Sequence, residues 1–245
     1  ELYMSVFRPA GDLRWNGNIK KYRLASNGDI MGLTSTGAEA LAVNSLKGVF
    51  LPNVKDLWAP EGSAEGHHDV LKGGAASQLP APASRDKIYT NLDGANSATF
   101  GTSTTIEVLR TRVDAGALLG YTAAGLTPPA CPTTESDVAS TTNPAVCQLV
   151  NWIRGADIAD LLPLENRKTT PITPAGNGNT TESRKDMGDP LHTRPAIVIY
   201  GGTPSKPNID DAMVYSVDND GMLHAIDPKT GVEQWAYLPW DRLHR

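Results

Sequence analysis

The chain has 245 residues, a formal net charge of −5, and 23 Gly and 18 Pro residues. This acidic balance provides no positive field for nucleic acid or anionic lipid, so a nucleic-acid-binding role is not expected. No apolar run approaches the roughly 18 residues that a membrane-spanning helix needs, and the chain is therefore expected not to span a membrane. The abundance of turn-forming residues favours short strands joined by many turns over a helical bundle.

Strand-like segments separated by turns fill residues 1–90. Residues 2–7 read as a strand, and residues 13–33 predict a hairpin that reverses at residues 26–29. Residues 34–90 hold short pieces between turns. Because no leader-like segment precedes the first strand, a signal peptide is expected to be absent or already removed. The sequence starts without an initiator Met and stops just after a blade-like unit, so the chain is expected to be a portion of a longer protein.

Residues 91–187 interrupt the strand pattern with helix and loop. Residues 105–119 predict a helix because their apolar side chains fall approximately on one face. Residues 145–153 predict a second, shorter helix that ends at Gly155. The polar stretch 169–186 is rich in turn-forming residues and is expected to be a loop.

The two cysteines, Cys131 and Cys147, flank a polar segment with little capacity to form a core of its own. In an oxidising compartment a disulfide between them would restrain this loop by roughly 3 kcal/mol on the chain-entropy model. We predict the disulfide, with two isolated thiols as the alternative; a zinc site is disfavoured because no close Cys-x-x-Cys pair and no nearby His is present. Non-reducing peptide mapping of the native protein should recover the bridged pair, and alkylation of both thiols in fresh native material would contradict it.

The most informative pattern lies near the C-terminus, where three short strands are predicted around Val214 and over residues 222–226 and 232–237. Tight turns at residues 218–221 and 227–231 join them, since the first offers Asn-Asp-Gly, which tolerates positive φ, and the second offers a proline and a glycine. This order is typical of a quinoprotein-type β-propeller blade. An arbitrary antiparallel meander is the alternative.

We therefore predict a mainly β fold, a quinoprotein-type β-propeller sector with an inserted helix and loop region. Residues 1–90 and 188–245 would form blade units, and residues 91–187 would form the insert. An isolated sector exposes strand edges, so further blades or a partner chain are expected to cover them. The residues expected to define the C-terminal blade motif are Asp218, Asn219, Asp220, Gly221, His224, Asp227, Gly231 and Trp235.

Five segments spread over residues 7–239 carry a family resemblance. They are Phe7-Arg-Pro with residues 14–24; Asp56-Leu-Trp58 with Gly73-Gly-Ala-Ala76, Arg85 and residues 88–90; Asn151-Trp-Ile-Arg-Gly155; residues 188–198; and residues 219–227 with Gly231 and residues 236–239. In this order they resemble the opening part of the C-terminal propeller of the PilC/PilY family, the type IV pilus tip adhesins and biogenesis factors. Thr193 stands where that family usually has Ser.

This resemblance implies a non-enzymatic, extracytoplasmic protein at the bacterial surface, at the pilus tip or associated with the outer membrane, that acts in adhesion or pilus assembly. The implied partners are pilin or minor pilins, a host surface receptor, and the remaining blades of its own propeller. The family's propeller also carries a calcium loop, which is implied to lie outside this chain. No cofactor is expected within the chain itself.

Several histidines invite a catalytic or metal-binding interpretation. His67-His68-Asp69 is expected to be a solvated loop, because adjacent residues point apart and no distant third ligand is evident. His192 and His224 are expected to be hydrogen-bonded structural residues, since neither accompanies a Ser in a nucleophile-elbow context.

A group of oxygen-bearing side chains near the C-terminus raises the question of calcium. The group is Asp210, Asp211, Asp218, Asn219 and Asp220. An EF-like loop starting at Asp218 needs an oxygen ligand at its fifth position and Gly at its sixth, and Met222 and Leu223 stand there. No metal site is expected in this group.

Two alternatives to a pilus protein share the predicted fold. A pyrroloquinoline quinone alcohol dehydrogenase uses the same Ala-x-Asp-x-x-Thr-Gly-x-x-x-Trp order. Its chemistry needs a calcium ion and an acidic base, and it commonly has a pair of adjacent cysteines. This chain has no adjacent cysteines. A propeller scaffold for outer-membrane protein assembly differs only in its partners. Fold alone does not decide among these functions.

Overall fold

The computed structural model is mainly β, as predicted, with little helix. It describes residues 1–9, 15–59, 65–85, 87–91, 103–105, 152–156, 185 and 187–239. The predicted disulfide, the loop at 169–184 and most of the two predicted helices lie outside these residues. Within the described part of the chain, no sheet closes on itself, and no helix has the length and apolarity to cross a bilayer.

The chain divides into two compact units. Unit 1 comprises Glu1–Leu79 and Asp186–Gln234, and unit 2 comprises Pro80–Lys185 and Trp235–Arg245. Unit 1 therefore joins segments from the two ends of the sequence that were assigned to separate blade units. The three-part division at 1–90, 91–187 and 188–245 stays a prediction.

One sheet of unit 1 is built around the buried strand β2 (Asn16–Leu24), which pairs antiparallel with β1 (Leu2–Arg8) and with β3 (Ile30–Leu33). The sheet continues to β4 (Glu39–Leu41), and β9 (Met187–Gly188) adds to β2 from far along the sequence. The predicted hairpin over 13–33 is confirmed from Asn16 onward. Its turn closes with the Ala25 amide donating to the Asp29 carbonyl at 2.8 Å.

Two small elements complete the N-terminal part of unit 1. β5 (Val43–Asn44) and β6 (Val49–Phe50) form a separate two-stranded hairpin. The helix α1 (Gly74–Ser77) is a single turn that packs on β2. Its first three residues are buried.

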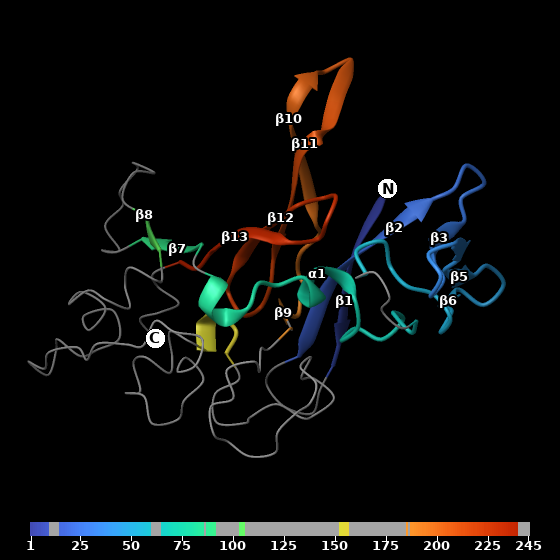
Figure 1. Ribbon diagram of the computed structural model, residues 1–245, viewed down its shortest axis with the longest axis horizontal. Coiled ribbons are helices and arrows are strands. Elements are labelled where there is room, and N and C mark those ends of the chain that lie inside the picture. The colour runs from blue at the N-terminus through green and yellow to red at the C-terminus, as the bar shows by residue number, and fades with distance from the viewer. Residues whose placement is uncertain are drawn as a thin grey trace, which may run out of the picture. The chain divides into compact units, whose positions relative to one another are not determined.

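Four strands follow one another near the C-terminus: β10 (Ala196–Thr203), β11 (Lys206–Val217), β12 (Leu223–Ile226) and β13 (Glu233–Tyr237). In unit 1, β11 pairs antiparallel with both β10 and β12, as Figure 1 shows in orange and red. The first predicted turn is confirmed, because Gly221 has φ +86° and its amide donates to the Asp218 carbonyl at 3.0 Å.

The second predicted turn is also confirmed. Gly231 has φ +75°, and its amide donates to the Asp227 carbonyl at 2.9 Å. The Asp227 carboxylate accepts hydrogen bonds from the amides of Lys229 at 2.7 Å and Thr230 at 3.1 Å. This side chain therefore organises the turn itself.

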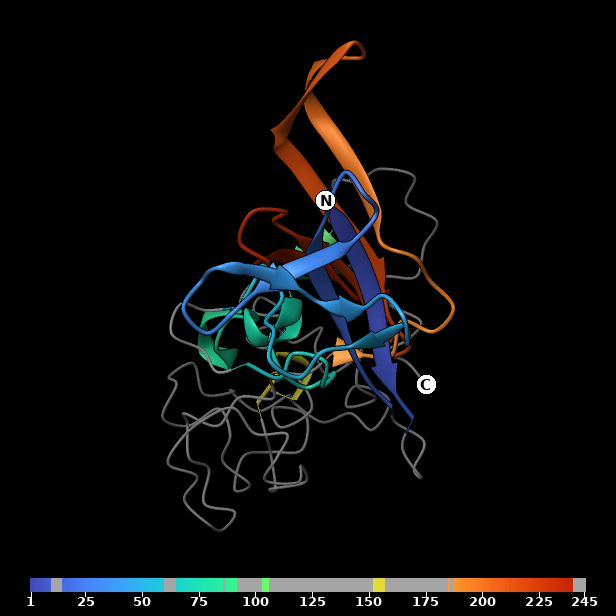
Figure 2. The same cartoon turned by 90° about the vertical axis from the view of Figure 1, so that its right-hand side faces the viewer.

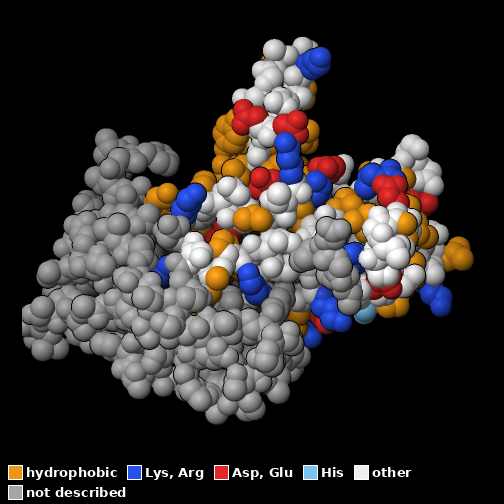
Figure 3. Space-filling view, viewed as in Figure 1, with side chains coloured by type: hydrophobic (Ala, Val, Ile, Leu, Met, Phe, Trp, Pro, Cys, Tyr) orange, Lys and Arg blue, Asp and Glu red, His pale blue; other side chains and the backbone are white. Residues whose placement is uncertain are grey.

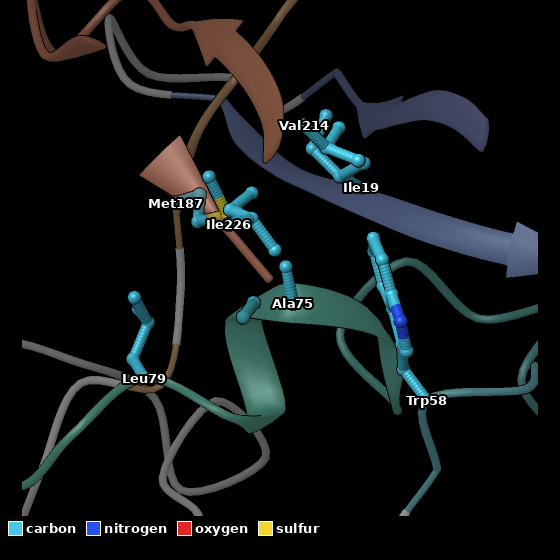
Figure 4. Packing of buried hydrophobic residues seen from close by; sticks show 8 residues of the cluster. Ile19, Trp58, Ala75, Leu79, Met187, Val214 and Ile226 are labelled. Carbon is cyan, nitrogen blue, oxygen red and sulfur yellow. The ribbon is translucent and has the colours of Figure 1, made fainter. Parts of the chain in front are cut away.

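The core of unit 1 joins strands and helix that are distant in sequence (Figure 4). Its buried members are Ile19, Trp58, Ala75, Ala76, Leu79, Met187, Val214 and Ile226. A second cluster of Tyr22, Ala42 and Val54 fills the space between the β2–β4 strands and the β5–β6 hairpin. Burial of these apolar side chains is the main stabilising contribution available to a unit with so little helix.

Unit 2 is described in fewer places. β7 (Ile88–Asn91) pairs in parallel with β13 and antiparallel with β8 (Ser103–Thr105), and the short 3-10 helix η1 (Pro82–Ser84) precedes it. The prediction of a helix over residues 105–119 is wrong at Thr105, because Thr105 is the last residue of strand β8. The β-branched side chains of Thr104 and Thr105 suit a strand better than a helix.

The end of the second predicted helix falls within the described part of unit 2. Trp152 and Ile153 are helical, and the Gly155 amide donates to the Trp152 carbonyl at 2.9 Å. Gly155 has φ +101°. The glycine expected to close this helix is therefore in a left-handed conformation that other residues rarely adopt.

Candidate functional sites: two buried ionic clusters and an exposed arm

His224 lies at the centre of a buried ionic cluster in unit 1, which we call the His224 cluster: Asp218, His224 and Glu233. The imidazole Nδ1 lies 2.6 Å from Glu233 Oε2, and Nε2 lies 2.8 Å from Asp218 Oδ2. Burial by itself lowers the His224 pKa, but the carboxylates of Asp218 and Glu233 outweigh that effect and raise the pKa to about 9. At neutral pH the ring is therefore a cation that donates from both nitrogens.

The His224 cluster also fixes the backbone around it. The Asp218 carboxylate accepts the amide of Gly188 at 3.0 Å and that of Met222 at 3.4 Å, so it joins β9 to the turn before β12. Next to it, the Asn219 side-chain amide donates to Asp189 Oδ1 at 2.8 Å. The cluster thus connects segments about thirty residues apart in the sequence.

The geometry of the His224 cluster favours a structural role over a catalytic one. Ser216 is the cross-strand partner of His224, and its buried hydroxyl has no hydrogen-bond partner among the described residues. Both nitrogens of His224 are occupied by carboxylates, so the ring offers no lone pair to activate that hydroxyl. The hydrogen-bonded role expected for His224 is confirmed, whereas Glu233 was not anticipated as its partner.

A second cluster surrounds Lys20 on β2, and we call Asn18, Lys20, Asp56 and His67 the Lys20 cluster. His67 is only 3% exposed, and its Nδ1 lies 2.6 Å from Asp56 Oδ2. The expectation of a solvated loop is therefore wrong for His67. It fails because the His67 amide donates to the Val54 carbonyl at 3.1 Å, which draws this residue inward, while His68 is exposed as expected.

Lys20 ties the His67 loop to β2. Its ammonium group donates to the backbone carbonyls of His67 and Asp69, the latter at 2.6 Å. Burial lowers the Lys20 pKa to about 8, an effect that Asp56 and Asp69 partly offset. Because two carbonyl groups hold the nitrogen, the lysine acts here as an anchor for backbone.

Asn18 performs the same task for the segment around α1. Its Nδ2 donates to the carbonyls of Val70 and Gly73, each at 2.9 Å, and its Oδ1 accepts the Ala76 amide at 3.0 Å. Asp56 contributes by accepting the Gly74 amide at 2.9 Å. These side chains supply hydrogen bonds to buried backbone groups around α1, most of which no strand or helix pairs.

The remaining blade-motif residues contact backbone or core. Gly231 is buried against Trp58, where a Cβ atom would lie 2.6 Å from the indole Cγ. Asp220 lies over Gly188, where a Cβ atom would lie 2.6 Å from the Asp220 amide nitrogen. Trp235 is half-buried in β13. Each of these residues thus has a packing role.

The acidic group near the C-terminus is dispersed among other partners. Asp210 pairs with Lys229 at 2.9 Å, and Asp218 holds His224. Across the described residues, no three His, Cys, Asp or Glu side chains are arranged to hold a metal ion. His192, for its part, lies in an exposed turn.

The most exposed feature of unit 1 is the β10–β11 hairpin, which we call the arm. It projects from the rest of the unit in two views (Figures 1 and 2). Large hydrophobic side chains are exposed along it: Ile197, Val198, Ile199, Tyr200, Ile209 and Val217. In Figure 3 hydrophobic side chains gather along the lower flanks of the arm, below a mostly polar tip. The sequence predicted a strand around Val214, in β11, but it did not predict an exposed apolar surface.

Comparison of the chain with protein-family models, with curated proteins and with solved structures finds no match.

Proposed function

We propose that this chain is a β-propeller sector of a PilC/PilY-like protein that acts without catalysis, through protein contacts, in type IV pilus adhesion or assembly. It would work outside the cytoplasm, at the pilus tip or the outer membrane. Its partners would be pilin or minor pilins, a host surface receptor, and the remaining blades of its own propeller. Any calcium would belong to that remainder.

The observation that carries this proposal is that segments bearing the resemblance meet in one core. Ile19, Trp58, Ala75 and Ile226 come from three of those segments and lie in the same buried cluster. The Trp58 indole also donates to the Pro228 carbonyl at 3.1 Å. A single blade system requires these motifs to pack together, so their convergence in one core supports the proposal.

The groups that surround the two buried histidines support the non-enzymatic part of the proposal. Carboxylates of Asp218 and Glu233 hydrogen-bond to the two ring nitrogens of His224. The Nδ1 atom of His67 contacts both the carboxylate and the backbone amide of Asp56. Ser216 stands across the strand pair from His224, but carboxylates hold both nitrogens of that ring, so it has no free lone pair with which to activate the hydroxyl.

Genetics in the source bacterium tests the pilus role. Strains would carry a gene deletion, the wild-type gene, or a gene lacking residues 212–237, and surface pili and adhesion would be counted. The wild type should restore both, and the two deletions should not. Normal piliation and adhesion in the gene-deletion strain would refute the proposal, while normal pili with defective outer-membrane proteins would point to an assembly scaffold.

A quinoprotein dehydrogenase is the second candidate, because Ala225, Asp227, Thr230, Gly231 and Trp235 keep that class's spacing. The full-length protein would be incubated with pyrroloquinoline quinone and calcium and tested for dye-linked alcohol oxidation. We expect no turnover above a protein-free control. Quinone-dependent oxidation would replace the proposed function with an enzymatic one.

A further inference from the structure

The arm has one open strand edge. β10 pairs with β11 on one side, and no other described strand pairs with it on the other. All eight residues from Ala196 to Thr203 lack a charge, and Ile197, Val198, Ile199 and Tyr200 are exposed. Proteins usually protect such edges with charged residues, prolines or a covering element, because unpaired amides and carbonyls readily accept another strand.

A carboxylate on the neighbouring strand β11 lies next to Gly201 of β10. Asp211 lies across Gly201, where a Cβ atom would lie 2.8 Å from Asp211 Oδ2. Its neighbour Asp210 is paired with Lys229 at 2.9 Å, whereas no described side chain forms an ion pair or hydrogen bond with the Asp211 carboxylate. Because Gly201 has no side chain, the carboxylate is accessible to a group that approaches along β10.

We propose that the open edge of β10 binds an extended segment of another protein as an added β-strand, and that this segment carries a Lys or Arg that pairs with Asp211 beside Gly201. Backbone hydrogen bonds along Ala196–Ile199 would supply the attachment, and apolar side chains of the segment would cover those of β10. The β10–β11 pairing shifts register between Ile199 and Gly201 and resumes from Gly201 to Thr203, so the cationic residue lies just beyond the regular stretch Ala196–Ile199.

The distribution of charged and apolar side chains favours a segment of another protein over a second copy of this chain and over a lipid surface. A second copy that paired through its own β10 would bring no cation, since that strand contains no Lys or Arg. A lipid surface would be met first by the arm's tip, which is exposed from Thr203 to Asn208 and carries no large hydrophobic side chain. The apolar side chains lie behind that tip on both faces, where a protein strand can reach them.

The inference rests on the proposed function in one respect, that the natural ligand is a protein. The test uses purified chain and synthetic peptides, so its outcome is separable from any result on piliation. The probe is a blocked peptide of alternating valine and threonine with a lysine near each end, so that either strand direction places one beside Gly201. Matched peptides carry glutamate in place of lysine, or a central proline that cannot donate to a strand ladder.

Fluorescence anisotropy should show saturable binding of the lysine peptide, with affinity about fivefold higher than that of the glutamate peptide. The proline peptide should not bind. Asp211→Asn should reduce the preference for lysine to less than about twofold, and Asp211→Lys should invert it, because opposite charges then face each other only with glutamate. Asp211 is exposed, so both variants should keep the circular dichroism spectrum and melting temperature of the wild type.

Four results would overturn the proposal. No binding of the lysine peptide up to about 1 mM means that the edge does not accept a strand. Equal affinities for the lysine and glutamate peptides mean that Asp211 does not select a cation, and undiminished binding of the proline peptide means that backbone pairing is not involved. A concentration-dependent dimer in sedimentation that excludes the peptide means that a second copy occupies the edge.

Discussion

Replacing His224 with leucine is expected to lower the free energy of unfolding near neutral pH by about 3 to 5 kcal/mol. The substitution removes the cation that lies between Asp218 and Glu233, at 2.8 and 2.6 Å from its two nitrogens. Two carboxylates would then remain buried without a positive partner. Glutamine is polar and close in size to histidine but carries no charge, so His224→Gln should also be clearly destabilising.

The wild-type protein should show a pH dependence that the leucine variant lacks. The His224 pKa is raised from 6.5 to about 9 in the folded protein, so folding favours the protonated ring. The stabilisation is fully present below the unfolded-state value of about 6.5, declines as pH rises, and is lost above about 9. The shift corresponds to about 3 kcal/mol across that window.

Urea unfolding of wild type, His224→Leu and His68→Leu from pH 6 to pH 10 measures both effects. His68 is an exposed histidine of the same unit, so its variant should follow the wild-type curve. If the difference between wild type and His224→Leu stays constant across this range, the ring is not held as a cation, and the interpretation of the His224 cluster is wrong.

Local turn chemistry explains which parts of the fold the sequence predicted. The hairpin between β2 and β3 and the two turns around β12 depend on glycines at positive φ, among them Gly28 and Gly221. The requirement for such residues is local, so it is visible in a short stretch of sequence. Gly155 also has positive φ, and for this reason it could be recognised in the sequence as the end of the second predicted helix.

Long-range pairing explains what the sequence did not predict. β9 is only two residues long and joins β2 from about 170 residues away, and β13 pairs with β7 in parallel. Neither contact leaves a periodicity in its own segment. The burial of His67 could not be predicted for the same reason. It depends on hydrogen bonds with Val54 and Lys20, and no local sequence pattern connects these residues to His67.

The Lys20 cluster leads to the second large effect, which concerns Gly74. Gly74→Ala is expected to destabilise the protein by more than about 3 kcal/mol, because a buried clash with backbone adds to the strain of positive φ. Its φ is +61°, and a Cβ atom there would lie 2.6 Å from the Ile19 carbonyl oxygen and closer still to Asn18 Oδ1. Relieving these clashes would require β2 or α1 to move, and both elements contribute side chains to the core.

Gly28→Ala is the matched control, because Gly28 also has positive φ, at +90°, but no atom lies within 4 Å of the position a Cβ would take. Its φ is farther than that of Gly74 from the left-handed minimum near +57°, so backbone strain alone would make Gly28→Ala at least as costly, at about 1 to 2 kcal/mol. Urea midpoints at constant m value compare the two variants. A larger loss for Gly74→Ala therefore isolates the contacts with Asn18 and Ile19, and equal midpoints would mean that α1 can shift away from β2 without loss of stability.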